Sequence, residues 1–331
     1  MERLKPMRCI TINLLTLCCA LATGVLSEPV FAQQKFPTRT IRIIAPFPAA
    51  GAADIVARVV AQIFSEQLGQ TAIVDNRPGA AGAIGSELVA RAAPDGYTLV
   101  VGVTASHGIN PAINPKLPYD AVKDFAPISL VTTIPHVLVV HPSLPVKSLQ
   151  DFITFAKAQP GLTYGSAGVG TPHHLAGEML GVMTGAKFTH VPYKGTAPAI
   201  VDLMGGQIYF MSSEYAAVAS QISAGKLRAL AAATANRLPG VNIPTFKEAG
   251  LVDFEVTAWY GLYAPAGTPA DIVNLLSKEI ARGLAKQEVK DRLGPLHAKP
   301  IGSSPAELAA YTSAEIVRWG KVAKAANIRV D

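Results

Sequence analysis

The stretch Ile41–Ala61, IRIIAPFPAAGAADIVARVVA, decides the fold. Its β-branched apolar residues Ile41–Ala45 predict a buried strand, which the following Pro residues end. Small residues then form the loop Pro46–Ala53, and from Ile55 onward the apolar residues return at helical spacing. Asp54 falls in the first turn of that helix, where a carboxylate favours the positive helix end. The stretch therefore predicts a strand, a tight loop and a helix whose free N–H groups face the mouth of the loop.

The same succession of strand, small-residue loop and helix recurs along the chain. Thr71–Asp75 predicts a second strand, followed by the small-residue loop Asn76–Gly82 and a helix over Ala83–Ala93. Tyr97–Val103 is almost wholly apolar, as a parallel strand covered on both faces would be, and it leads into the polar loop Thr104–Asn110. Strand, loop and helix in regular succession indicate an α/β fold with a doubly wound sheet.

The middle of the chain predicts a second unit of the same class. Ile128–Thr133 and Val137–His141 are predicted as two strands that lead into it. Further on, the loop Gly165–His174 precedes a predicted helix, and the strand Ile208–Met211 is followed by the loop Ser212–Glu214. The starts of two helices are predicted from their cap residues. Ser148 is an N-cap with Asp151 at the third helical position, and Ser304 is an N-cap with Pro305 at the first.

The strand predicted at Trp259–Ala264 returns the chain to the first unit. We therefore expect domain 1 to comprise residues 33–134 and 258–331, and domain 2 to comprise residues 135–257. Two α/β units joined by two crossover segments predict a clamshell with a cleft between the domains.

The first 32 residues predict a cleaved signal peptide. Basic residues precede the apolar stretch Ile10–Leu26, and Val30 and Ala32 place small residues at the two positions that a signal peptidase reads. Export to the periplasm, with cleavage before Gln33, is the expectation; a membrane anchor is the alternative.

Composition excludes several classes of protein. All three Cys residues (Cys9, Cys18, Cys19) lie in the signal peptide, so the remaining chain predicts no disulfide, no thiol nucleophile and no Cys-ligated metal. The formal net charge of +6 is spread along the chain without a Lys/Arg cluster, which argues against nucleic acid as a partner.

Six small-residue loops carry the functional prediction. Each follows a predicted strand and precedes a helix start, and ligands of open α/β sheets bind beyond the carboxyl ends of the strands. Two facing domains would bring several of these loops to one cleft lined with N–H groups and hydroxyls, which suits a small carboxylate. The loops lie near Pro46, Pro78, Thr104, Ser166, Tyr193 and Ser212.

Enzyme interpretations fit less well. The chain reads Tyr164-Gly165-Ser166-Ala167-Gly168, which lacks the first Gly of a nucleophile elbow, so a serine hydrolase that uses Ser166 and a histidine is kept as an alternative. His174 and Glu178 are spaced i,i+4 but have no third ligand nearby, and the opening loop lacks the dinucleotide-binding Gly pattern. We expect no catalytic residue, no metal and no cofactor.

Taken together, seven segments resemble the Bug family, the periplasmic solute-binding receptors of tripartite tricarboxylate transporters. In chain order they are Ala45–Asp54, Val74–Gly82, Pro94–Leu99, His190–Gly195, Gly205–Gln207, Ala224–Leu230 and Ala264–Pro269. The resemblance implies a type II periplasmic-binding-protein fold with the ligand between two domains. It also implies a carboxylate ligand held by backbone amides, hydroxyls and water, and integral membrane transporter subunits as partners. A sensor-accessory receptor would share this ligand chemistry, and a monomer is expected.

The chain departs from the family pattern at two loops. Ala50 stands where the family usually has a Gly, which is a strained choice if that position needs a positive φ. Ser212-Ser213-Glu214 replaces the more usual Phe-Asp-Asn. The predicted ligand-binding residues come from all these loops: Phe47, Pro48, Ala49, Ala50, Gly51, Thr104, Ser106, Asn110, Ser166, Gly168, Gly170, Thr171, His173, Lys194, Gly195, Ser213 and Glu214.

Overall fold

A computed structural model describes residues 36–329 of the chain. The chain divides into two compact units, Met1–Thr38 and Arg39–Asp331, and the helices and strands described below all lie in the second. The predicted signal peptide lies outside the described residues. Over the part of the chain that is described, no helix combines the length and the apolar character needed to cross a membrane.

The strands of the second unit join in one sheet of ten strands, in the order β2-β1-β3-β9-β4-β7-β5-β6, with β8 and β10 also paired to β4. β1 is parallel to β2 and β3, and β5 is parallel to β6 and β7, whereas β9 runs antiparallel to both β3 and β4. The bounds are β1 (Ile41–Ala45), β2 (Ala72–Asn76), β3 (Thr98–Val103), β4 (Phe125–Val140), β5 (Leu162–Ser166), β6 (Phe188–Pro192), β7 (Phe210–Glu214), β8 (Arg228–Ala232), β9 (Thr257–Pro265) and β10 (Lys299–Pro300).

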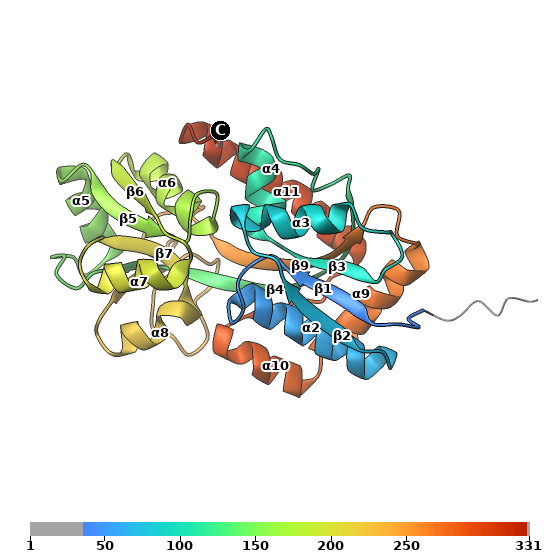
Figure 1. Ribbon diagram of the computed structural model, residues 1–331. Helices are drawn as coiled ribbons and strands as arrows, with labels where there is room; N and C mark the ends of the chain where they lie inside the picture. The colour runs from blue at the N-terminus through green and yellow to red at the C-terminus, as the bar shows by residue number, and fades with distance from the viewer. Residues whose placement is uncertain (1–35, 330–331) are drawn as a thin grey trace, which may run out of the picture. The chain divides into compact units, whose positions relative to one another are not determined.

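Two lobes are built on this sheet. Lobe 1 is defined here by β1, β2, β3, β9, β10 and residues 125–135 of β4. Lobe 2 is defined by β5 to β8 and residues 136–140 of β4. Figure 1 shows β4 running from lobe 1 into lobe 2 beside β9. The lobes are therefore continuous through hydrogen-bonded strands.

Helices cover both lobes, and the predicted caps are confirmed. Ser148 Oγ accepts a hydrogen bond from Asp151 N at 3.1 Å, and Ser304 Oγ accepts one from Glu307 N at 3.3 Å. The helices are α2 (Ala52–Leu68), α3 (Ala83–Ala90), α4 (Asn110–Ile113), α5 (Leu149–Ala158), α6 (Pro172–Thr184), α7 (Thr196–Met204), α8 (Tyr215–Ser223), α9 (Ala270–Leu284), α10 (Gln287–Leu293) and α11 (Pro305–Ala325), with single turns η1 (Ala80–Gly82), η2 (Thr104–Ile109) and η3 (Gly294–Leu296).

Three local predictions are wrong. The two strands predicted at 128–133 and 137–141 form the single strand β4, because Pro135 keeps an extended backbone and pairs with Thr257 of β9. The predicted polar loop Thr104–Asn110 is the helical turn η2, which runs straight into α4. Ser212–Glu214, predicted as a loop, completes β7 in register with β4.

The predicted domain boundaries fall at the last two rungs of the β4–β9 ladder. Ile134 pairs with Ala258 and Pro135 pairs with Thr257, so both proposed crossings lie at neighbouring rungs. The division into domains 33–134 with 258–331 and 135–257 stays a prediction.

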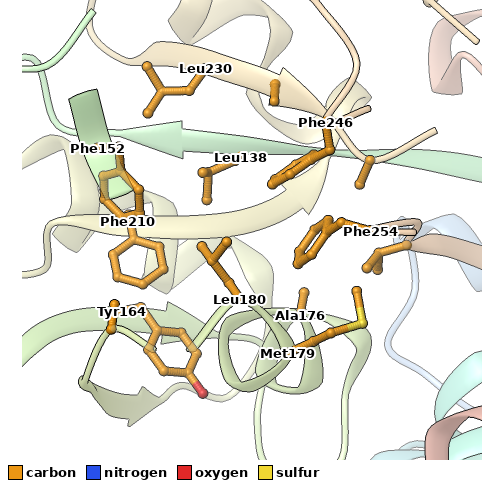
Figure 2. Close-up of a cluster of buried hydrophobic side chains, with 14 of the residues drawn as sticks. Leu138, Phe152, Tyr164, Ala176, Met179, Leu180, Phe210, Leu230, Phe246 and Phe254 are labelled. Atoms are coloured by element: carbon orange, nitrogen blue, oxygen red, sulfur yellow. The ribbon is translucent and has the colours of Figure 1, made fainter. Parts of the chain in front are cut away.

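Aromatic packing fills the core of lobe 2 (Figure 2). Phe152 meets Phe210 edge to face at a centroid distance of 5.0 Å, and Phe246 stacks on Phe254 at 4.0 Å. Leu180 of α6 is buried in the same cluster. This core fixes α6 against β7, and the first turn of α6 and the end of β7 both reach the candidate site.

A buried carboxylate ties β9 to α11. Glu315 Oε2 accepts hydrogen bonds from the indole N–H groups of Trp259 and Trp319, each at 2.9 Å. Both Trp side chains are fully buried, and Arg318 donates to the second oxygen of Glu315 at 2.8 Å. One carboxylate thus satisfies two buried donors that have come from distant parts of the chain.

We expect Glu315→Leu to lower the free energy of unfolding by on the order of 3 kcal/mol, because each buried donor left unpaired costs about 1–3 kcal/mol. Urea unfolding of the purified protein measures this. Lys321→Leu, an exposed position of the same helix, is the control and should leave the unfolding midpoint within experimental error. Equal midpoints for the two variants would contradict the role given to Glu315.

Candidate functional site

A pocket of about 580 Å³ lies between the two lobes. Lobe 1 contributes the opening loop and nearby strand residues, and lobe 2 contributes the starts of three helices. The lining residues are 47–53, Ile55, Val103, Ala105, Ile134, Ala167, 171–173, 194–198, Ile200, Glu214, Ala216, Ala217, Ala258, Tyr260, Pro295 and Leu296.

Four helix N-termini meet at this pocket. The first residues of α2, α6 and α7, and residues in the first turn of α8, are among those that line it. In none of these four described helices does the side chain of the N-cap residue accept a hydrogen bond from the first turn. The first-turn N–H groups have no acceptor inside their own helix, so the pocket is surrounded by positive helix ends.

Asp54 holds the opening loop in place. Its carboxylate is buried and accepts hydrogen bonds from Ala50 N (3.0 Å), Arg58 Nε (2.9 Å) and Asn76 Nδ2 (3.0 Å). Asn76 Nδ2 also donates to Phe47 O at 3.0 Å. Burial works against the charged form, but the hydrogen bonds from Arg58, Ala50 and Asn76 lower the pKa of Asp54 below its usual 3.8. Sequence analysis placed Asp54 at the helix start and missed its bonds to the loop, which depend on the distant Asn76.

Ala50 adopts the left-handed conformation, with φ of 66°. A Gly would occupy this region without strain. The sequence predicts strain at Ala50 if the position needs a positive φ, and the positive φ is what the structure has. The hydrogen bond from Ala50 N to Asp54 stabilises that conformation.

The Gly/Ser loop between β5 and α6 uses its hydroxyls internally. Thr171 Oγ1 donates to Gly168 O at 2.7 Å, and Ser166 Oγ accepts from Gly168 N at 3.0 Å. Thr171 lines the pocket, whereas Ser166, Gly168 and Gly170 do not. The left-handed φ values of Gly168 and Gly170, 131° and 74°, let the loop turn sharply into α6.

Ser166 also contacts a histidine, as the hydrolase alternative requires. Its Oγ lies 2.6 Å from His190 Nε2. Ser166 is fully buried, however, and His190 stacks against His174 and Tyr164. Among residues 36–329, no carboxylate is hydrogen-bonded to His190, so the orienting acid of a catalytic triad is missing.

Three predicted binding residues of lobe 1 are buried and do not line the pocket. Thr104 Oγ1 accepts from Trp259 N at 2.8 Å, Ser106 Oγ lies 2.9 Å from His107 Nδ1, and Asn110 Nδ2 donates to Ala80 O at 3.3 Å. These polar groups are satisfied within the protein because the segment coils into η2 and α4. Ser213 is likewise fully buried in β7. The predicted residues at the pocket are Phe47, Pro48, Ala49, Ala50, Gly51, Thr171, His173, Lys194, Gly195 and Glu214.

Glu214 belongs to a buried polar cluster at the pocket wall. Its Oε2 lies 2.9 Å from His173 Nε2, and its Oε1 lies 3.9 Å from His136 Nε2. Burial works against its charge, but the neighbouring His173, which is hydrogen-bonded to it, lowers the pKa of Glu214 well below its usual range. Burial also lowers the pKa of His136 to about 3, so that its imidazole is neutral. His136 did not enter the predicted site because its position opposite Glu214 follows only from the β4–β7 register.

A family comparison identifies the chain. Residues 56–328 match the family described as "Tripartite tricarboxylate transporter family receptor". The chain belongs to this receptor family.

Related proteins match over most of the receptor. Protein BugT of Bordetella pertussis is 36% identical over 309 residues, which cover 92% of this chain and 94% of BugT. The solved structure "R. palustris Rpa4515 with adipate" is 38% identical with a TM-score of 0.82, covering 89% of this chain and 99% of that one. The periplasmic binding protein BugD is 33% identical with a TM-score of 0.79, at 89% and 99% coverage.

These matches confirm the resemblance to the Bug family and the predicted fold class. The roles given to individual binding residues stay predictions.

Asp54 predicts a pH-dependent contribution to the receptor's stability. Because its pKa in the folded state is lowered, that contribution is complete well above pH 3.8 and is lost as the pH falls through 3.8 and below. We expect Asp54→Asn to cost about 1–2 kcal/mol at pH 7 and less as the pH falls to 3.

Urea unfolding of both proteins at the two pH values measures the difference. Asp253→Asn makes the same chemical change at an exposed position and is the control. A cost of Asp54→Asn that is equal at both pH values would contradict the assignment.

Proposed function

We propose that this chain is a periplasmic receptor that captures a small organic carboxylate between its lobes and delivers it to the integral membrane subunits of a tripartite transporter. The observation that carries the proposal is the meeting of four uncapped helix N-termini at one pocket. Such helix ends bind anions through backbone N–H groups. Adipate in the related R. palustris structure supports a carboxylate as the anion.

The charges at the pocket agree with an anionic ligand. Lys194 is the cation among the described lining residues, and Glu214 is paired with His173 on the same wall. Much of the remaining lining is Ala, Pro and Ile, which suits the carbon chain of an organic acid. Backbone N–H groups bind a carboxylate without burying a paired cation, which avoids part of the desolvation cost of an ion pair.

The proposed function is non-enzymatic transport binding by a monomer, with no nucleic acid partner. The hydrolase alternative is disfavoured because Ser166 is buried away from the pocket and its His190 partner lacks an orienting acid. Ester or amide turnover by the purified protein that Ser166→Ala abolishes would reverse this ranking.

The function is tested in two steps. The melting temperature of the purified mature protein should rise with adipate or another carboxylate of a small panel, because a ligand that binds only the folded state stabilises it. Uptake of the same acid by cells that lack this receptor should be restored by the intact gene. Ligand binding without any effect on uptake would favour the sensor-accessory alternative.

We expect Thr196→Pro to weaken adipate binding about tenfold or more. Thr196 is the first residue of α7, a position where Pro is tolerated in a helix but removes the N–H group. A lost hydrogen bond to a charged group is worth about 1.5–3 kcal/mol. Isothermal titration measures the affinity, and Thr196→Ala, which loses the hydroxyl but keeps the N–H, is the matched control. Equal affinities for the two variants would show that this helix end does not hold the carboxylate.

We also expect the lobes to close on the ligand. The proposed hinge lies at the neighbouring rungs near Thr133–Pro135 of β4 and Val256–Trp259 of β9. Small-angle scattering should show a smaller radius of gyration at saturating adipate. An unchanged radius would mean that the cleft is already closed or does not move.

A further inference from the structure

Three side chains in lobe 2 are arranged as a metal-binding group. His136 lies on β4, His173 in the first turn of α6, and Glu214 at the end of β7. Each offers one ligand atom, and the three atoms lie within 4.8 Å of one another. His173 and Glu214 line the pocket, and His136 is fully buried beside them.

Only one ring nitrogen of His136 has a hydrogen-bond partner among the described residues. Its Nδ1 lies 3.1 Å from Ser212 Oγ, which fixes the ring, and its Nε2 faces Glu214 Oε1 at 3.9 Å. That separation is too long for a hydrogen bond. Over residues 36–329, Nε2 of His136 has no hydrogen-bond partner, although the side chain is completely buried. A buried imidazole nitrogen aimed at a carboxylate oxygen across this gap leaves room for a cation.

The distances from Glu214 to the two histidines fit a metal ion better than an ammonium group. Tetrahedral ligands about 2.1 Å from Zn²⁺ lie about 3.4 Å apart. An ammonium hydrogen-bonded to two acceptors would hold them about 4.5 Å apart. The observed separations of 2.9 Å and 3.9 Å lie on either side of the metal value. Two imidazoles and a carboxylate also form a known three-residue ligand set for Zn²⁺, with a fourth position left open.

We propose that His136, His173 and Glu214 bind one divalent transition-metal ion of the Zn²⁺ class, whose open coordination position faces the pocket. Resting on the proposed function, we infer further that this position takes a carboxylate oxygen of the transported acid. Binding displaces the proton that His173 Nε2 shares with Glu214, and Nδ1 of His173, which is buried without a hydrogen-bond partner among the described residues, accepts it. Ser212 acts as a positioning residue for His136.

Metal binding is tested first, without any carboxylate. Mature protein expressed without a histidine tag is treated with a chelator and dialysed against Zn²⁺, and bound metal is quantified. We expect one Zn²⁺ per chain, with saturable binding lost in His173→Gln and Glu214→Gln. His141→Asn, which changes a histidine directly after the end of β4 that contacts Ser143, is the matched control and should bind normally. Circular dichroism checks that each variant is folded.

Ser212→Ala provides an independent check on the geometry. Loss of an outer hydrogen bond to a ligating histidine weakens metal binding by about tenfold or more, and Ser212→Thr, which keeps the hydroxyl, should restore it. Absence of saturable Zn²⁺ binding, or equal binding by wild type, His173→Gln and Glu214→Gln, would overturn the metal site.

Coordination of the transported acid by the metal is tested by whether Glu214→Gln strengthens or weakens adipate binding. Without a metal, Glu214→Gln removes a negative charge beside the ligand and should strengthen adipate binding. In the presence of Zn²⁺, the same substitution prevents the metal from binding and should therefore weaken adipate binding, and chelator treatment should weaken adipate binding by the wild type. Stronger binding by Glu214→Gln in the presence of Zn²⁺ would overturn coordination of the ligand by the metal. Failure of adipate and the whole carboxylate panel to bind, with Zn²⁺ still bound, would count against the proposed function alone.

Discussion

The antiparallel ladder between β4 and β9 is the constraint on which the rest of the structure depends. β4 extends over Phe125–Val140; residues 125–135 pair with β9, and residues 136–140 pair with β7 and β8. Because every rung fixes register, the ladder sets lobe 1 against lobe 2 and thereby opposes the opening loop to the starts of α6, α7 and α8. Trp259 on β9 is held in turn by Glu315 of α11, so the returning C-terminal segment stabilises the same junction.

Much of the fold could be predicted because it depends on short stretches of sequence with a recognisable pattern. Parallel strands appear as short apolar runs, and the helices that follow carry their own caps, as at Ser148 and Ser304. The continuity of β4 could not be predicted, because Pro135 is usually a strand breaker and its tolerance here depends on pairing with β9. The helical turn at Thr104–Ile109 was missed for a similar reason, since Tyr119 OH donates to Ser106 O from outside the segment.

The candidate site could likewise be predicted only where it depends on local sequence pattern. Its small-residue loops precede helices in the sequence, so Phe47–Gly51 and Lys194–Gly195 could be placed near a pocket from pattern alone. The polar side chains could not, because their partners are distant in sequence: Thr104 bonds to Trp259, and Glu214 meets His173 and His136. A polar residue after a strand predicts that its side chain is near the site, but the tertiary contacts decide whether it is free to bind.

The four helix ends at the pocket have a consequence for how such receptors diversify. A backbone N–H group is present whatever side chain its residue carries, Pro excepted, so substitutions around the pocket leave these donors in place. The backbone groups that attract negative charge are therefore unaffected by most substitutions, while replacement of lining side chains such as Ile55 and Leu296 would reshape the remainder of the pocket. In such a chain, a few side-chain replacements can change which acid is bound, while the backbone N–H groups that bind the anion stay the same.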